Sequence, residues 1–374
     1  MTPVFNELAA QPRVSAFLRS AIAADRVSHA YLFVGPPGAG KKTTAKAFAA
    51  ALFCGDKGCG SCAACSRVRR GVHPDVHIIA PEGAAGYLAE QVRDIVHDAS
   101  LAPIEGPYKF YLVESADLFN DSAANAFLKT LEEPPGDVVF VLMAHSYEAV
   151  MPTIVSRCQV VRFKRLAPSQ SMALLREKTG AEEDDAAAAL AATGGVVPRA
   201  TEFLRSPARR AARDTILRTF KDLAAMDDLD VLTAARELLT AVKAPLEEVR
   251  VAHAAELVER QEFLGGRVST KAVEERHKRQ LTAREREGIA EVLNVAESWL
   301  RDCLVMSQGV GEIVANRDSL DAMEEVAAVM TPAAAVKALA AVNETRRLIS
   351  YNVSPQLAME AMLFDVREVL RCPR

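Results

Sequence analysis

The chain has 374 residues, of which 50% are hydrophobic and 25% are charged, with a formal net charge of −4 at pH 7. This length predicts two or three domains with a large core, and the slightly acidic balance argues against a protein that coats nucleic acid, although a local basic patch would fit. No apolar run approaches the roughly 20 residues that span a bilayer, and residues 1–10 lack a signal-peptide pattern, so we expect a cytoplasmic protein without a membrane partner.

Five short apolar runs predict the strands of one sheet. They are separated by stretches long enough for helices, as in a parallel sheet that is covered on both faces. Residues 88–99, between the second and third runs, repeat their apolar positions at helical spacing and predict a crossover helix. The runs comprise residues 31–34, 76–79, 110–113, 138–142 and 159–163.

The stretch after the first strand is one residue short of a phosphate-binding loop. Residues 35–44 read Gly-Pro-Pro-Gly-Ala-Gly-Lys-Lys-Thr-Thr, whereas the motif requires G-x-x-x-x-G-K followed by Ser or Thr. A buried strand before the loop and a helix over residues 44–53 after it give the expected context, in which backbone N–H groups cradle phosphates and Lys41 reaches the terminal ones. The glycines of the loop are Gly35, Gly38 and Gly40.

The hydroxyl that is missing at position 42 is the one that would hold Mg²⁺. Lys42 places a positive charge there instead, and Thr43 is turned about 100° around the helix and cannot replace the hydroxyl. The loop therefore predicts a nucleotide-binding fold without ordinary hydrolysis. Whether it retains ATP or ADP without a metal stays open at this level.

Four cysteines follow this helix in the spacing C-x₄-C-x₂-C-x₂-C. In a reducing compartment such a cluster fits metal ligation better than disulfides, and four thiolates match a closed, structural zinc site. An iron–sulfur cluster is the alternative, because it also takes four thiolates. Free buried cysteines fit poorly, because the segment is polar and rich in glycine. The predicted ligands are Cys54, Cys59, Cys62 and Cys65.

The third strand ends in Glu114 and Ser115, where a phosphate-loop ATPase places an Asp that orders Mg²⁺ and a Glu that activates water. Glu114 is long enough to reach a metal, but Ser115 cannot act as a base at neutral pH. With Lys42 these are three departures at three catalytic functions. The alternative is an active ATPase that uses Glu114 and a carboxylate from elsewhere, for which Glu132 and Glu133 are candidates by composition only.

Two further runs, Leu-Lys-Thr-Leu-Glu-Glu-Pro-Pro at 128–135 and Ser-Arg-Cys at 156–158, reveal a family resemblance. Together with His-Ala-Tyr-Leu-Phe at 29–33, the cysteine insertion and His-Pro-Asp at 73–75, they resemble the delta-prime family of bacterial clamp-loader subunits, of the AAA+ class. The resemblance is close over roughly the first two hundred residues and loose beyond. It implies an α/β AAA+ domain with a parallel five-stranded sheet over residues 1–166, a small helical lid over 167–206 and an all-α collar or oligomerisation domain over 207–374.

The resemblance also implies a function and partners. It suggests a non-hydrolysing clamp-loader subunit of the DNA polymerase III holoenzyme, with motor subunits (gamma/tau), the delta subunit and the sliding clamp as partners, and primer-template DNA contacted through the assembled complex. Arg157 would reach in trans into the ATP site of a motor subunit, although without the resemblance it would pass for a surface charge. Arg199 would lie where the family places its second sensor arginine, and it would contact a bound nucleotide or the adjoining domain. The alternatives are an active motor subunit and a zinc-stabilised binding module.

The last segment is nearly all helical by its periodicity. Met359, Leu363, Val366 and Leu370 place one apolar stripe on a final helix. Residues 274–287 are highly charged and read as a solvated helix or exposed loop, with a DNA contact as the open alternative.

Overall fold

The computed structural model describes residues 3–8, 11–82, 86–263, 271–351 and 353–371. The chain divides into two compact units, Met1–Ala167 and Pro168–Arg374. The predicted boundaries of the three domains, at 166 and 206, remain predictions.

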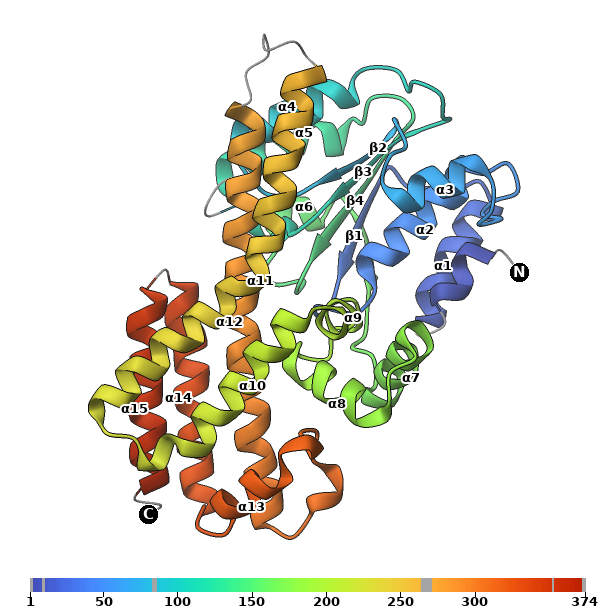
Figure 1. The fold of residues 1–374 in the computed structure, drawn as a ribbon. Coiled ribbons are helices and arrows are strands. Elements are labelled where there is room, and N and C mark those ends of the chain that lie inside the picture. The colour runs from blue at the N-terminus through green and yellow to red at the C-terminus, as the bar shows by residue number, and fades with distance from the viewer. Residues whose placement is uncertain (1–2, 9–10, 83–85, 264–270, 352, 372–374) are drawn as a thin grey trace. The chain divides into compact units, whose positions relative to one another are not determined.

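The first unit is built on a five-stranded sheet in the order β2-β3-β4-β1-β5, in which every adjacent pair is parallel (Figure 1). The strand β1 lies between β4 and β5, with Tyr31 in register with Val141 and Gln159. All five predicted strands and the fold class are confirmed. The strands are β1 Ala30–Val34, β2 Val76–Ile79, β3 Lys109–Val113, β4 Val138–Ala144 and β5 Gln159–Arg162.

Helices cover both faces of this sheet, and each face has its own core. On one side Phe33 packs in a cluster with Phe48 of α2, while on the other Leu32 packs in a cluster with Phe127 of α5, as the alternation along a strand requires. The helical elements are η1 Pro3–Leu8, α1 Pro12–Ala23, α2 Lys41–Phe53, α3 Ala63–Arg70, α4 Ala89–Ala99, η2 Ala116–Leu118, α5 Asp121–Glu132 and α6 Pro152–Val155.

The helix α2 begins three residues earlier than the apolar pattern predicts, at Lys41 rather than at residue 44. The reason lies in Gly40, which has a left-handed φ of 87° and forms the N-cap. Lys42 and Thr43 therefore lie on the first helical turn, and their side chains project from it in different directions.

The second unit is entirely helical within its described residues. The glycine pair Gly194–Gly195, with φ values of 64° and 80°, separates α8 from α9. The elements are α7 Pro168–Thr179, α8 Glu183–Ala192, α9 Val197–Arg205, α10 Pro207–Asp222, η3 Leu223–Ala225, α11 Asp228–Phe263, α12 Lys271–Ser307, η4 Gly311–Ile313, η5 Arg317–Ser319, α13 Leu320–Ala327, α14 Pro332–Ser350 and α15 Pro355–Arg371.

The apolar stripe predicted on the last helix is confirmed, because Met359, Leu363, Val366 and Leu370 of α15 are all buried. The charged stretch 274–287 lies inside α12. Of its side chains, Lys278 is exposed and His277 is buried. The side chains of Arg276 and Arg279 lie outside the described residues.

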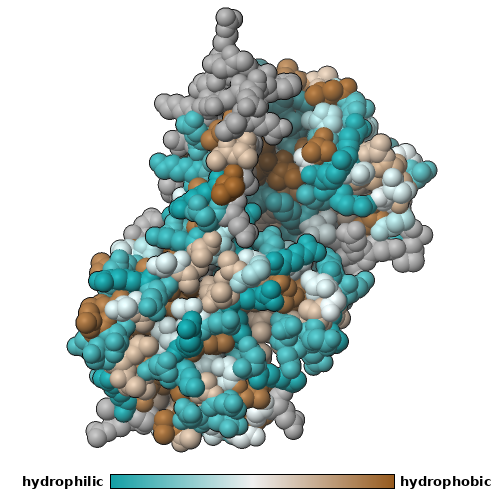
Figure 2. Space-filling view, in the orientation of Figure 1, coloured by the Kyte–Doolittle hydropathy of each residue, from teal (hydrophilic) through white to brown (hydrophobic). Residues whose placement is uncertain are grey.

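Hydrophilic residues cover most of the second unit on the face shown in Figure 2, with hydrophobic residues scattered among them. Exposed hydrophobic side chains of this unit include Leu229, Val336 and Leu357. Among the described helices, every one is too short or too polar to span a bilayer.

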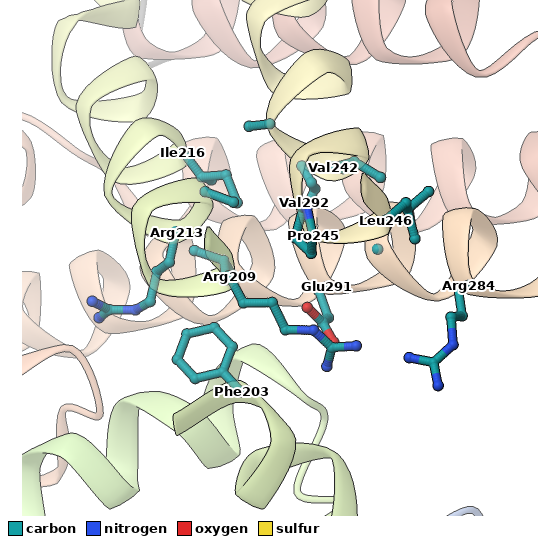
Figure 3. Close-up of a pocket in the computed structure, with 14 residues that line it drawn as sticks. Phe203, Arg209, Arg213, Ile216, Val242, Pro245, Leu246, Arg284, Glu291 and Val292 are labelled. Carbon is teal, nitrogen blue, oxygen red and sulfur yellow. The ribbon is translucent and has the colours of Figure 1, made fainter. Parts of the chain in front are cut away.

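A small cavity of about 30 Å³ marks the place where α11 crosses α12 (Figure 3). Pro245 lies inside α11 and removes one backbone hydrogen bond from it. The ion pair between Arg209 and Glu291 borders the cavity, with 3.0 Å between nitrogen and oxygen, and burial raises the pKa of Glu291. Gly288 of α12 approaches Val242 of α11 so closely that a Cβ added to Gly288 would lie 2.6 Å from Val242 Cγ1.

This crossing predicts that Gly288→Ala destabilises the second unit. The substitution gains helix propensity, about 1 kcal/mol, but forces a methyl group into a packed contact, which costs about 1–3 kcal/mol. We expect a lower midpoint in urea unfolding followed by circular dichroism. In a Val242→Ala background the same substitution should be neutral or stabilising, because the clashing atom is gone. An equal loss in both backgrounds would contradict the close approach.

Candidate functional site

The phosphate-type loop joins β1 to α2 and is shaped by its glycines. A Cβ added to Gly35 would lie 2.6 Å from the carbonyl oxygen of Phe163, so a side chain does not fit there. Gly38 and Gly40 have φ values of 77° and 87°, in the left-handed region that favours glycine. These constraints let the backbone turn sharply into the N-terminus of α2, where N–H groups can meet an anion.

Gln11 holds this loop in place through hydrogen bonds. The sequence alone did not predict this role of Gln11. Its Nε2 donates hydrogen bonds to the carbonyl of Ala39, at 3.1 Å, and to that of Lys164, at 2.6 Å. Gln11 is buried, so these bonds replace contacts with water. A lone glutamine between two helical segments gives no sequence signal, because its partners are 28 and 153 residues away.

Lys41 points back at the loop. Its ammonium donates to the carbonyl oxygens of Gly35 and Pro36, the latter at 3.1 Å. Burial lowers the pKa of Lys41, and the negative charge of Asp117 partly offsets that effect. Lys41 is therefore placed at the loop, as the motif requires.

Lys42 forms an ion pair with Glu114, with 2.5 Å between Nζ and Oε1. Their side chains are 52% and 27% exposed, respectively. This pair joins the two positions at which a phosphate-loop ATPase holds Mg²⁺, the hydroxyl after the motif lysine and the acid that ends the third strand. Magnesium does not fit here, because the hydroxyl is absent and the carboxylate already contacts an ammonium group.

The neighbouring polar residues do not restore the metal ligands. Thr43 is exposed on the first turn of α2. Ser115 adopts a left-handed φ of 52° at the start of η2 and supplies no carboxylate. Of the predicted site residues, the structure pairs Lys42 with Glu114 and places Lys41 against the carbonyl of Gly35.

Asp117 is a carboxylate of this site whose role sequence reasoning missed. The side chain is 13% exposed, and its Oδ2 accepts a hydrogen bond from Nδ1 of His145 at 2.9 Å. Burial raises the pKa of Asp117, but the hydrogen bond and charge of His145 outweigh it, so the pKa lies below its ordinary value. Its Oδ1 is buried and has no hydrogen-bond partner among the described residues. Asp117 is therefore a charged group beside Lys41.

The four predicted metal ligands converge after α2. Their sulfur atoms all lie within 4.8 Å of one another, with 3.6 Å between Cys54 and Cys59 and 3.7 Å between Cys54 and Cys62. Tetrahedral zinc with bonds of about 2.3 Å implies sulfur separations of about 3.8 Å, and a disulfide needs about 2.05 Å. The donor set therefore fits a tetrahedral metal ion, and the four cysteines can hold one.

Backbone N–H groups of the cluster point at its sulfur atoms. The amides of Cys59, Cys62 and Cys65 donate to the Sγ atoms of Cys54, Cys59 and Cys62 at 3.4, 3.4 and 3.5 Å. Hydrogen bonds from the backbone of Ser61 and Cys62 lower the pKa of Cys59 to about 6. Such bonds stabilise thiolates, which are the form that binds metal.

Arg157 is braced by its own unit. Its Nε donates to Oε1 of Glu132 at 2.9 Å, its Nη2 contacts the same oxygen, and its Nη1 donates to the carbonyl of Thr153 at 2.8 Å and to Ser156 Oγ at 3.0 Å. The arginine side chain remains 31% exposed. Glu132, a candidate base in the ATPase alternative, is thus committed to Arg157.

Arg199 belongs to the second unit, where it pairs with Glu287 of α12, with 2.9 Å between Nη2 and Oε1. Both side chains are more than a third exposed, at 38% and 41%. A role of Arg199 toward nucleotide remains a prediction.

Two family models match the chain. The model described as DNA polymerase III, delta subunit, matches residues 10–167, and the model described as DNA polymerase III, delta subunit, C terminal, matches residues 276–368.

Curated relatives agree with these matches. The chain is 40% identical over 166 residues to DNA polymerase III subunit delta' of Bacillus subtilis, and the matched region covers 44% of this chain and 50% of the relative. It is 35% identical over 201 residues to subunit delta' of Pseudomonas aeruginosa, covering 52% and 61%. It is also 35% identical over 183 residues to subunit tau of B. subtilis, covering 48% and 32%. The matches thus span between 32% and 61% of the length of these relatives.

Among solved structures, the chain is similar to a DNA polymerase III, gamma subunit-related protein from Thermotoga maritima, with a TM-score of 0.46 and 18% identity, covering 95% of this chain and 99% of that one.

The geometry of the cysteine cluster predicts that the purified chain contains about one zinc ion. Cys62→Ser should lose the metal and melt at a lower temperature, because one ligand of a closed site is gone. Metal analysis and differential scanning calorimetry would check both effects. Cys158→Ser, which removes a thiol outside the cluster, is the control. Iron with acid-labile sulfide in the wild-type chain would instead support the cluster alternative.

Proposed function

Because the chain belongs to the delta′-type family of bacterial clamp-loader subunits, we propose that it acts in DNA replication as a subunit of a DNA polymerase III clamp loader. In this proposal the subunit itself does not hydrolyse ATP. The observation that carries this proposal is the Lys42–Glu114 ion pair. An ammonium group at the metal position removes the divalent cation that stabilises charge during phosphoryl transfer. The loop is then kept for its structure or for binding rather than for turnover.

Arg157 is the residue that we propose to act in trans. Its guanidinium lies on the surface, is always charged and is held in a defined orientation by Glu132 and Thr153. Such a group can stabilise the charge on a phosphoryl transferred in the ATP site of a neighbouring motor subunit, an effect worth about 10³ to 10⁵ in rate for arginine fingers in general.

The proposed partners follow from the family. They are the gamma/tau motor subunits and the delta subunit, with which the chain would help to open the sliding clamp and load it on primer-template DNA. The helical second unit would supply the contacts that hold such an assembly together. The four cysteines would hold zinc in a structural role, since all four ligand positions come from the protein.

An active motor subunit is the second candidate. Two observations favour it, the 35% identity to subunit tau over 183 residues and the charged Asp117 beside Lys41. Against it, Asp117 is hydrogen-bonded to His145, and Lys42 pairs with the acid that would order the metal.

The two candidates differ in the activity of the isolated chain. We expect negligible ATP hydrolysis with Mg²⁺, at the level of a Lys41→Ala control, because no metal site is formed. Release of inorganic phosphate from the purified chain measures this. Brisk turnover that Lys41→Ala abolishes would establish the motor instead.

The trans role of Arg157 is tested in the assembled loader. Arg157→Ala should assemble normally by size measurement, yet lose the DNA-stimulated ATPase of the site that the arginine serves, because its positive charge is missing in the transition state. Arg93→Ala, which removes an exposed arginine from α4, is the matched control. Unchanged turnover in the Arg157→Ala complex would refute the role.

A further inference from the structure

A groove of about 380 Å³ lies at the edge of the sheet in the first unit, between the strand β2 and the helix α4. The stacked rings of His77 and Tyr111, with centroids 4.8 Å apart, form part of its wall. Leu88, a hydrophobic side chain that is 47% exposed, also lines it. The described lining residues include none from the phosphate-type loop or the cysteine cluster, so this edge groove is separate from both.

The strand β2 leaves one side of its backbone free for a further strand. In the described sheet it is an end strand and pairs with β3 alone (Figure 1). The carbonyl oxygens of Asp75 and Ile79 accept bonds from the β3 side, so by alternation the N–H and C=O groups of Ile78 point outward. The carbonyl of Ala80, which also points outward, accepts a hydrogen bond from Gln91 Nε2 of α4 at 2.7 Å.

The α4 side of the edge groove carries a regular row of carboxylates. Glu90, Asp94 and Asp98 recur at every fourth residue, so they share one face of the helix and follow each other at about 6 Å along its axis. Glu82 adds a fourth carboxylate just after β2. The described lining residues include neither Lys nor Arg, so the edge groove is strongly acidic.

Lys109 of β3 shows how a lysine meets this row. Its Nζ donates to Oδ1 of Asp98 at 3.0 Å and to the backbone carbonyl of the same residue at 2.7 Å. His77 adds no positive charge at neutral pH, because burial lowers its pKa. Glu90 and Asp94, farther along the row, are exposed and remain for a charge from outside the chain.

We propose that the edge groove binds an extended, basic segment of a partner protein, which lies alongside β2. Alternate residues of an extended strand are about 6.7 Å apart, close to the spacing of the carboxylates on α4. A segment with Lys or Arg at every second position can therefore pair its charges with Glu90 and Asp94. Its backbone can meet the outward groups of Ile78, as in other cases of strand addition.

A metal ion does not fit the same row. Among the described residues, only the cysteine cluster brings three or more ligand atoms close enough to share one ion. Carboxylates spread along a helix suit an elongated partner with several charges instead. The proposed clamp-loader role does not depend on this groove.

The test uses a fluorescein-labelled peptide with lysine at alternate positions, Lys-Thr-Lys-Thr-Lys-Thr, titrated with the full-length chain and followed by fluorescence anisotropy. We expect binding that weakens as salt rises, because exposed charge pairs are screened. Glu90→Gln combined with Asp94→Asn should weaken binding about five- to tenfold. Asp137→Asn combined with Glu148→Gln removes two exposed carboxylates elsewhere in the first unit and should leave the affinity unchanged.

Two further probes separate a site for a strand from general attraction of cations. A peptide of the same composition with its lysines adjacent, Lys-Lys-Lys-Thr-Thr-Thr, should bind more weakly than the alternating peptide, and spermine should compete poorly with it. Equal affinity for the two peptides, or displacement by spermine at the same charge concentration, would overturn the proposal. Equal losses in the two double variants, or no binding at millimolar peptide, would overturn it as well.

Discussion

Parallel pairing of the central strands is the constraint on which the site depends. Because β1 pairs with β4 and β5, and β3 pairs with β4, the carboxyl ends of these strands meet at one edge of the sheet. Lys42 follows β1, Glu114 follows β3 and His145 follows β4, so this edge brings Lys42 to Glu114 and His145 to Asp117. The backbone carbonyl of Phe163, after β5, closes the loop against Gly35. The Lys42–Glu114 and Asp117–His145 contacts depend on this pairing.

At this edge the Lys42–Glu114 ion pair joins the two positions at which a phosphate-loop ATPase holds Mg²⁺. The chemistry of an ion pair between Lys42 and Glu114 differs from that of a hydroxyl and a carboxylate that hold Mg²⁺. An ammonium group can neutralise phosphate charge, but it cannot polarise a phosphoryl oxygen as a divalent cation does. Binding and hydrolysis are therefore separable in such a loop. That separation would suit the proposed role of a subunit that does not hydrolyse ATP itself.

The sequence predicted those parts of the structure that depend on neighbouring residues. The five strands and the stripe on α15 follow from local hydrophobic patterns, and the glycine loop and the cysteine cluster follow from fixed spacings. The helix start at Lys41 was missed because apolar periodicity begins only after the first turn. The pairs Asp117–His145 and Arg157–Glu132 were missed because they join residues 28 and 25 positions apart, and the fold decides which polar groups face each other.

The bracing of Arg157 has one consequence for how a subunit interface forms. In the free chain the guanidinium already contacts a carboxylate, Glu132, at both Nε and Nη2. If Arg157 acts in trans as proposed, a phosphate of a neighbouring subunit would have to compete with this carboxylate for the guanidinium. In the trans role proposed for Arg157, docking would therefore exchange one counterion of the guanidinium for another.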